Sequence, residues 1–162
     1  MARRLVVCTL FLGLLGCGDQ DEIAELTGYV KAIQKFNHYN QQVEGYIVQF
    51  DDPTFEKTKS RINAARQLID DYAAAVNGIG DIEKSDLRNT HKLYSRSFDQ
   101  AKILARDLTG DLNRQAHSVV IGLRQLRTII RDRVYPSIEV LLARKKFSYE
   151  KGSEYGLPWG NE

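Results

Sequence analysis

Histidines and paired carboxylates are the side chains of this chain that could hold a metal ion or a haem. The sequence has three histidines, His38, His91 and His117, and two aspartate pairs, Asp51-Asp52 and Asp70-Asp71. Bundled helices can place a cofactor between facing histidines. The chain lacks Cys-x-x-Cys-His for covalent haem attachment, Glu-x-x-His for a di-iron site and His-Glu-x-x-His for zinc. The sequence therefore predicts no metal and no other cofactor, and we interpret the aspartate pairs as helix-end or solvated charges.

Motifs for nucleophilic catalysis are also missing from the sequence. There is no Gly-x-Ser-x-Gly and no phosphate-binding glycine loop, so we predict that the protein is not an enzyme. A non-catalytic alternative is a small-ligand site between helices, lined by His38 and His91 with the tyrosines Tyr39 and Tyr94. The competing interpretation is that each histidine is simply packed and hydrogen-bonded at a helix interface.

Cys17, near the N-terminus, says more about the protein than the histidines and carboxylates do. Arg3 and Arg4 precede an apolar run of eleven residues, Leu5 to Leu15, which is the arrangement of a secretory signal. The run is too short for a membrane-spanning helix, which takes about 20 residues. The segment Leu14-Leu15-Gly16-Cys17 resembles the lipobox of bacterial lipoproteins. The resemblance implies a diacylglyceryl group on the Cys17 thiol, removal of residues 1–16, and acylation of the new amine, for example with palmitate.

This processing would decide where the protein resides. Cys8 lies in the removed segment, so Cys17 is the only cysteine of the mature chain and no internal disulfide forms. Several acyl chains anchor a protein durably, at about 0.8 kcal/mol per buried methylene. We therefore expect a bacterial envelope protein on the periplasmic side of a membrane, with residues 17–22 as a lipidated tether. In enteric lipoproteins, an aspartate directly after the lipidated cysteine signals retention in the inner membrane. This chain has Gly18 at that position, so the resemblance favours the outer membrane.

Charge separates the two halves of the mature chain. Removal of residues 1–16 reduces the 23 basic side chains to 21, which equals the 21 acidic ones, so net charge gives no support for nucleic-acid binding. Residues 17–86 carry 13 acidic and 7 basic side chains, whereas residues 87–162 carry 8 and 14. One interpretation is that the halves pack together with opposite charges along a seam between helices. The other is a basic face for an anionic partner, formed by Arg124, Arg127 and Arg131.

Apolar residues recur at intervals of three and four, which predicts helices and no strands. One helix is expected over about 22–50, broken at Asp51-Asp52-Pro53. A second is expected to begin at Pro53, with Asp52 as its N-terminal cap. Asn77-Gly78 predicts the end of that helix, and a third helix follows from about residue 83.

Gly110 and Asp111 distinguish two architectures. If Gly110 is a turn and Asp111 caps a fourth helix, residues 23–147 form an elongated antiparallel four-helix bundle. If one helix instead runs from about 83 to 134, the chain is a helical hairpin plus one long kinked helix. The unpaired apolar face of that long helix would imply a homodimer. We favour the split, and we expect Pro136 to kink or restart the last helix.

The C-terminal segment 148–162 has no helical period, but it carries the large side chains of Tyr155, Leu157 and Trp159. Aromatic anchors are enriched at binding hot spots, so this segment either docks onto a partner or packs back on the bundle. Together these features predict a lipid-anchored structural or adaptor component that binds an envelope protein. The alternatives are the small-ligand site and an exclusion or immunity lipoprotein, which neighbouring genes would reveal.

Overall fold

The computed structural model describes residues 17–107 and 109–144, and every regular element in these ranges is a helix. The elements in chain order are α1 (Cys17–Gln34), α2 (Asn37–Asp51), α3 (Lys59–Asn77), α4 (Ser85–Ala105), α5 (Leu112–Ile129), the π-helical turn η1 (Ile130–Val134) and α6 (Tyr135–Arg144). The predicted all-α class is confirmed.

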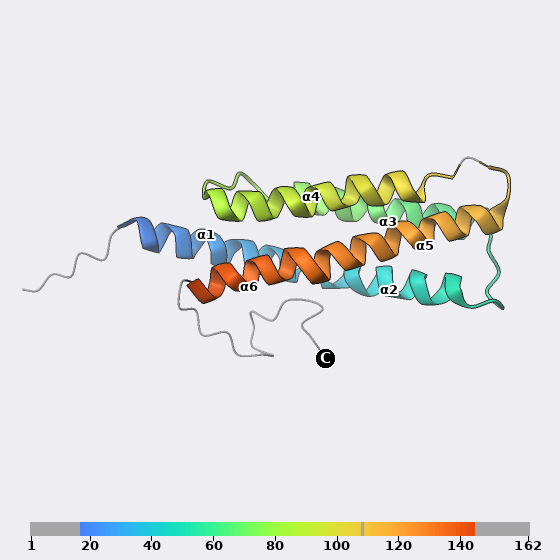
Figure 1. Ribbon diagram of the computed structural model, residues 1–162, viewed down its shortest axis with the longest axis horizontal. Helices are drawn as coiled ribbons and strands as arrows, with labels where there is room; N and C mark the ends of the chain where they lie inside the picture. Colours follow the sequence, from blue (N-terminus) through green and yellow to red (C-terminus); the bar gives the residue numbers. More distant parts are fainter. Residues whose placement is uncertain (1–16, 108, 145–162) are drawn as a thin grey trace, which may run out of the picture.

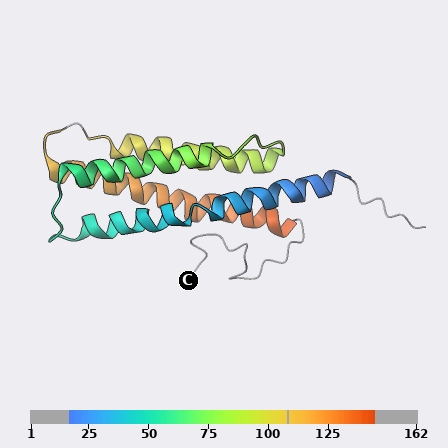
Figure 2. The same cartoon turned by 180° about the vertical axis from the view of Figure 1, so that it is seen from behind.

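The helices form four antiparallel rods (Figures 1 and 2). The first rod is α1 followed by α2, the second is α3, the third is α4, and the fourth is α5, η1 and α6 in line. α2 packs on α3 and α5, and α4 packs on the same two helices, which closes the bundle. The start of α1 lies at one end of the long axis, and the α2–α3 and α4–α5 connections lie at the other end (Figure 1). The elongated antiparallel four-helix bundle expected from the sequence is therefore confirmed.

The first rod differs from the single helix predicted over 22–50. α1 already begins at Cys17, so residues 17–22, expected as a tether, are helical, and a break at Lys35 and Phe36 separates α1 from α2. At this break the amides of Lys35 and Phe36 bond to carbonyls three residues earlier. The turn here is tighter than that of an α-helix, and Ile33 and Phe36 both face the core.

The connection from α2 to α3 also corrects a prediction. Asp52 does not cap a helix that begins at Pro53, because α3 begins only at Lys59. The Asp52 carboxylate instead accepts hydrogen bonds from the amide and the hydroxyl of Thr54, at 2.8 and 2.7 Å. Thr58 caps α3, with its hydroxyl oxygen accepting from the amide of Arg61. Asp52 therefore stabilises a local turn, which satisfies the carboxylate as well as a helix N-terminus would.

The expected break before the last rod is confirmed. α4 ends at Ala105, and Asp111 caps α5 by accepting from the amides of Asn113 and Arg114 at 2.8 and 3.3 Å. Further along, Pro136 lies in the first turn of α6, directly after η1. Proline cannot donate the amide hydrogen bond that a continuous helix needs. A π-helical turn precedes the proline, and in it the Tyr135 amide donates to the Ile130 carbonyl five residues back.

A close contact between helices joins α4 and α5. A Cβ atom added at Gly122 would lie 2.6 Å from the carbonyl oxygen of Ala101 and 3.1 Å from the Cβ atom of Ala105. Only small residues meet here, so the two backbones approach closely. At the other end of the bundle α1 is held to the start of α4, where the Glu25 carboxylate accepts from the amides of Glu83 and Lys84 at 2.5 and 3.2 Å.

Candidate functional site

The structure separates the two histidines that the sequence offered as ligand-binding residues. His38 is exposed on α2, and its Nδ1 lies 2.8 Å from the Lys35 carbonyl oxygen. His91 is half-buried on α4, and its Nδ1 lies 3.3 Å from the hydroxyl of Tyr29 on α1. Burial lowers the pKa of His91. Each histidine is thus packed against its own neighbours, and among the described residues no group of three His, Cys, Asp or Glu side chains could hold a metal ion.

The two tyrosines named with these histidines have different surroundings. The Tyr39 ring lies 3.9 Å from the ring of His38 and stacks on that of Tyr72, with centroids 4.8 Å apart and planes 10° apart. Tyr94 is fully buried in the bundle core. The rings of His38, Tyr39 and Tyr72 therefore run from the exposed surface into the core, where Tyr72 contacts Tyr94.

The bundle interior contains a cluster of polar groups that the sequence analysis did not identify. Asn40, Tyr72, Tyr94 and Tyr135 come from α2, α3, α4 and α6, and all four are buried. The Tyr72 hydroxyl donates to Asn40 Oδ1 at 2.7 Å, and Asn40 Nδ2 donates to the Tyr135 hydroxyl at 3.0 Å. The hydroxyls of Tyr72 and Tyr94 also bond to each other. We call these four residues the polar ring.

Counting protons shows which group donates in each hydrogen bond of the polar ring. A hydroxyl has one proton, and Tyr72 gives its proton to Asn40, so Tyr94 donates to Tyr72. The Tyr135 hydroxyl accepts from Asn40 Nδ2, and it also interacts with the hydroxyls of Tyr94 and Tyr72. Each group can therefore donate and accept within the interior, which is the condition for a stable buried polar network.

Burial governs the ionisation of the polar ring. It raises the pKa of Tyr72 and Tyr94 well above the ordinary value of 10.0, and it raises the pKa of Tyr135 to about 12. The three phenols are therefore neutral at physiological pH, and the ring offers no base or nucleophile there. Its evident role is to fix four helices at one level. The available signal was Asn40 itself, an amide in phase with apolar neighbours, which needs buried partners.

The arginines predicted as a basic face all have carboxylate partners. Arg124 pairs with Asp51, and Arg127 pairs with Glu44 at 2.9 Å, so both join α5 to α2. Arg131 pairs with its neighbour Asp132 at 2.6 Å. The acidic and basic halves of the chain thus meet along a seam between helices, as the first interpretation of the charge pattern predicted. The seam leaves little uncompensated charge on these arginines for an external partner.

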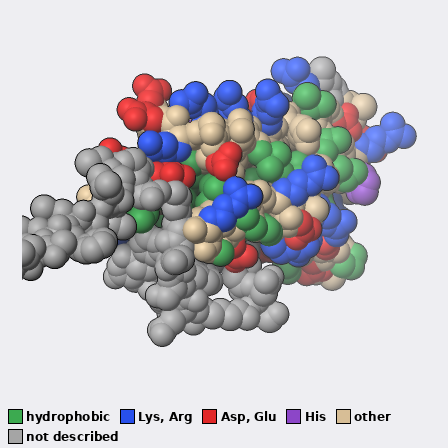
Figure 3. Space-filling model, turned by 60° about the vertical axis from the view of Figure 1, so that its left-hand side comes forward, with side chains coloured by type: hydrophobic (Ala, Val, Ile, Leu, Met, Phe, Trp, Pro, Cys, Tyr) green, Lys and Arg blue, Asp and Glu red, His purple; other side chains and the backbone are tan. Residues whose placement is uncertain are grey.

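Uncompensated cations lie instead on the solvent-facing side of the third rod, which we call the α4 crest. The crest consists of Arg88, Lys92, Arg96, Asp99, Ile103 and Arg106, at steps of three and four. These positions lie opposite the buried side of the helix, which includes Tyr94, Phe98 and Ala101. Figure 3 shows Lys and Arg side chains in a row along the top of the bundle, the level at which Figure 1 draws α3 and α4.

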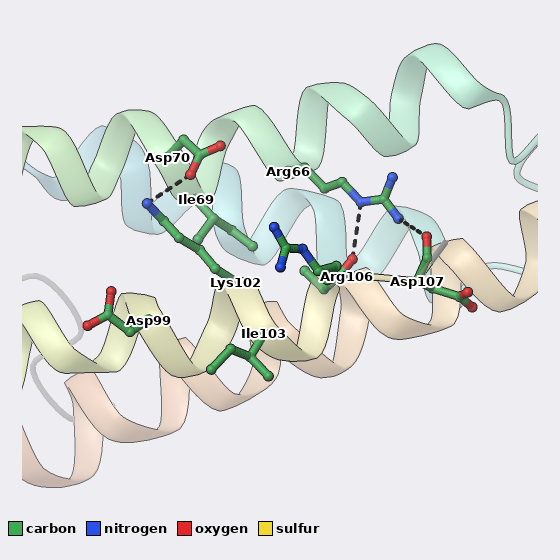
Figure 4. A pocket seen from close by; sticks show the side chains of 9 residues that line it. Arg66, Ile69, Asp70, Asp99, Lys102, Ile103, Arg106 and Asp107 are labelled. Atoms are coloured by element: carbon green, nitrogen blue, oxygen red, sulfur yellow. Dashed lines mark hydrogen bonds and ion pairs between the residues drawn. The ribbon is translucent and has the colours of Figure 1, made fainter. Parts of the chain in front are cut away.

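A groove of about 570 Å³ lies beside the crest, between α3 and α4 (Figure 4). Ile69 and Ala105 give it an apolar wall, and Lys102 spans it to reach Asp70 at 2.8 Å. Arg66 closes one end by donating to the carbonyls of Ala105 and Asp107, both at 3.1 Å. These two bonds satisfy carbonyls at the C-terminal end of α4. We call this hollow the α3–α4 groove.

The remaining predicted site residues lie beyond these surfaces. Tyr155, Leu157 and Trp159 fall outside the described residues, and Cys17 is the first residue of α1. Within the described ranges, no helix combines the length and apolar character needed to cross a bilayer. Comparison of the chain with protein-family models, with curated proteins and with solved structures gave no match. The fold and its surfaces therefore define the protein as an antiparallel four-helix bundle with a polar ring inside and a basic crest outside.

Proposed function

We propose that this protein is a lipid-anchored, periplasm-facing adaptor of the bacterial envelope that acts by binding another protein. The single observation that carries the proposal is the N-terminal order of two arginines, an apolar run and Gly16-Cys17. Acylation at Cys17 would hold the chain on a membrane, with the outer membrane favoured by Gly18. The absence of catalytic motifs from the sequence supports a binding role rather than a catalytic one.

The bundle geometry is compatible with such a role. Because α1 starts at Cys17 itself, an anchor there would attach directly to one end of the long axis (Figure 1). α1 has 18 residues and α2 has 15, so at 1.5 Å per residue the first rod extends about 50 Å. A bundle anchored in this way can present surfaces far from the bilayer, which is what an adaptor between envelope components requires.

The anchor can be tested with two cysteine variants. Cells producing the wild-type chain would be fed a clickable palmitate analogue, and label and membrane fractionation would be measured. Cys17→Ser should lose the label and leave the membrane fraction. Cys8→Ser is the matched control and should keep both, because Cys8 lies in the segment that processing removes. If Cys17→Ser remains acylated and sediments with membranes, the proposed anchor is wrong.

A further inference from the structure

The α4 crest combines four cations with a single carboxylate. Arg88 donates to the carbonyls of Ile82 and Glu83, which are uncharged groups. The side chains of Lys92, Arg96 and Arg106 have no hydrogen-bond or ion-pair partner among the described residues. Other surface cations, such as Arg124, Arg127 and Arg144, pair with carboxylates across helices. The crest is therefore a part of the surface where positive charge is concentrated and left unbalanced.

An exposed apolar side chain lies within this cationic row. Ile103 is on the crest between Asp99 and Arg106, and 72% of its surface is exposed, more than for any other large hydrophobic residue described. Leu104, beside it, is 40% exposed. Because the Ile103 side chain stays in water, it adds almost no burial free energy to the monomer fold. A partner that covers it would remove this apolar surface from water, which is favourable.

The α3–α4 groove adds a receptor for a side chain next to these residues. Asp99, Ile103 and Arg106 belong to both the crest and the groove rim. Figure 4 shows the Arg106 side chain extending from the end of α4 towards α3, beside Ile69. Its guanidinium can donate two parallel hydrogen bonds to a carboxylate. The same place thus offers apolar contact and a free cation.

We propose that the α4 crest and the α3–α4 groove bind an acidic segment of a partner protein. Carboxylates of the segment would face Lys92, Arg96 and Arg106, and a large apolar side chain would cover Ile103 and enter the groove. This inference rests on the proposed adaptor function and names its partner by chemistry. The crest cations favour an anionic occupant. The groove, whose lining has three basic and three acidic side chains, favours an occupant with an apolar side chain to insert.

The position of the groove favours a protein over the membrane that would hold Cys17. The C-terminal end of α4 lies towards the end of the bundle opposite the start of α1 (Figure 1). Arg66 of α3, which follows the α2–α3 connection, bonds to Ala105 at that end. An upright bundle would hold the groove tens of ångströms from the bilayer, given the length of the first rod. A partner that projects into the periplasm can reach it there.

The first test is binding of a fluorescein-labelled synthetic peptide with glutamates at i, i+4 spacing around one leucine. Anisotropy would be measured on the full chain in neutral detergent at low and physiological salt. The crest variant Lys92→Glu/Arg96→Glu/Arg106→Glu should bind about tenfold more weakly than wild type, and its salt dependence should decrease. The matched control Lys35→Glu/Lys59→Glu/Arg133→Glu has the same net charge but reverses scattered exposed cations. Its affinity should stay within about twofold of wild type.

Three outcomes would overturn the proposal. One is equal loss of peptide binding in both variants, and a second is no peptide binding to wild type. The third concerns membranes and uses the full chain carrying Cys17→Ser in flotation with vesicles of neutral and anionic phospholipid. If that chain binds anionic vesicles through the crest cations but does not bind the peptide, the occupant is a lipid surface. Urea unfolding of both variants would establish that each one folds.

A cross-linking experiment connects the peptide result to the envelope. A photoreactive residue would replace Ile103, and in a control chain it would replace Val48, which is 67% exposed on α2. A protein adduct at position 103 that the crest variant abolishes supports the proposal, and equal adducts at both positions contradict it. Failure of the crest test leaves palmitate labelling at Cys17 unchanged. Failure of the labelling test leaves peptide binding unchanged, so the two proposals can fail separately.

Discussion

From the polar ring we predict that removal of the Tyr72 hydroxyl lowers the stability of the protein. Tyr72→Phe keeps the ring stack on Tyr39 and the edge contact with Phe98, whose centroid is 4.9 Å away. It removes the donor to Asn40 Oδ1 and the acceptor of the Tyr94 proton. The substitution therefore changes hydrogen bonding at constant shape and isolates the contribution of the network.

The expected magnitude follows from counting the groups left unpaired. Asn40 Oδ1 loses its hydrogen bond, and a buried unsatisfied polar group costs about 1–3 kcal/mol. The Tyr94 hydroxyl can still turn to Tyr135, which limits its own cost. Tyr72→Phe should therefore lower the free energy of unfolding by about 2–3 kcal/mol. This is a large fraction of the 5–15 kcal/mol typical of a domain.

Urea unfolding followed by circular dichroism would measure this change, with Tyr46→Phe as the control. Tyr46 is half-buried on α2, and the structure records no hydrogen bond for its hydroxyl, so its loss should cost less than about 0.5 kcal/mol. In the double variant Tyr72→Phe/Asn40→Leu both partners are apolar. Its total cost should fall below the sum of the single variants by at least about 1 kcal/mol. Equal costs for Tyr72→Phe and Tyr46→Phe, or strict additivity in the double variant, would refute the network argument.

Three further measurements test other parts of the structure. Gly122→Ala should lower the free energy of unfolding by about 1–3 kcal/mol in a urea titration, because the new Cβ would meet the backbone of α4. Gly45 has open space around it, so Gly45→Ala should be neutral or stabilising in the same titration. Asp111→Ala should cost about 1 kcal/mol by removing the cap of α5, and a cost as small as that of Asp99→Ala would contradict that role. Alkaline stability should decrease because Tyr135 has a pKa of about 12 when folded, against 10.0 when unfolded. Its contribution is complete below pH 10, and up to about 3 kcal/mol is lost as the pH rises through 12. A wild-type loss of stability over this range no greater than that of Tyr135→Phe would contradict this.

Local features of the sequence determined much of the architecture. The three-and-four spacing of apolar residues, the turn residues Gly110 and Asp111 and the position of Pro136 specify helices and their ends through interactions within a few residues. These predictions agree with the structure because each depends on a period, a cap or a missing amide proton. The signal-like N-terminus is equally local, and it carries the proposed anchor without any knowledge of the fold.

The predictions that were wrong concern choices between local alternatives of similar energy. Asp52 can cap a helix or stabilise a turn with Thr54, and both satisfy its carboxylate. The residues around Lys35 and Phe36 can continue a helix or break it. In each case packing against the rest of the bundle contributes to the choice, and the Phe36 ring at the break is buried in the core.

The sites depend on tertiary structure even more strongly. Asn40 and Tyr135 are 95 residues apart, and only the rotation and axial position of four helices bring them into one ring. The same rotation gives Arg124 and Arg127 their carboxylate partners while it leaves the cations of the α4 crest without any. The sequence by itself therefore determined that the chain forms helices and where most of them end, and its N-terminal residues resemble a lipobox. Tertiary structure decided which polar groups are paired and which remain free to bind, because that depends on distances between segments that no local pattern encodes.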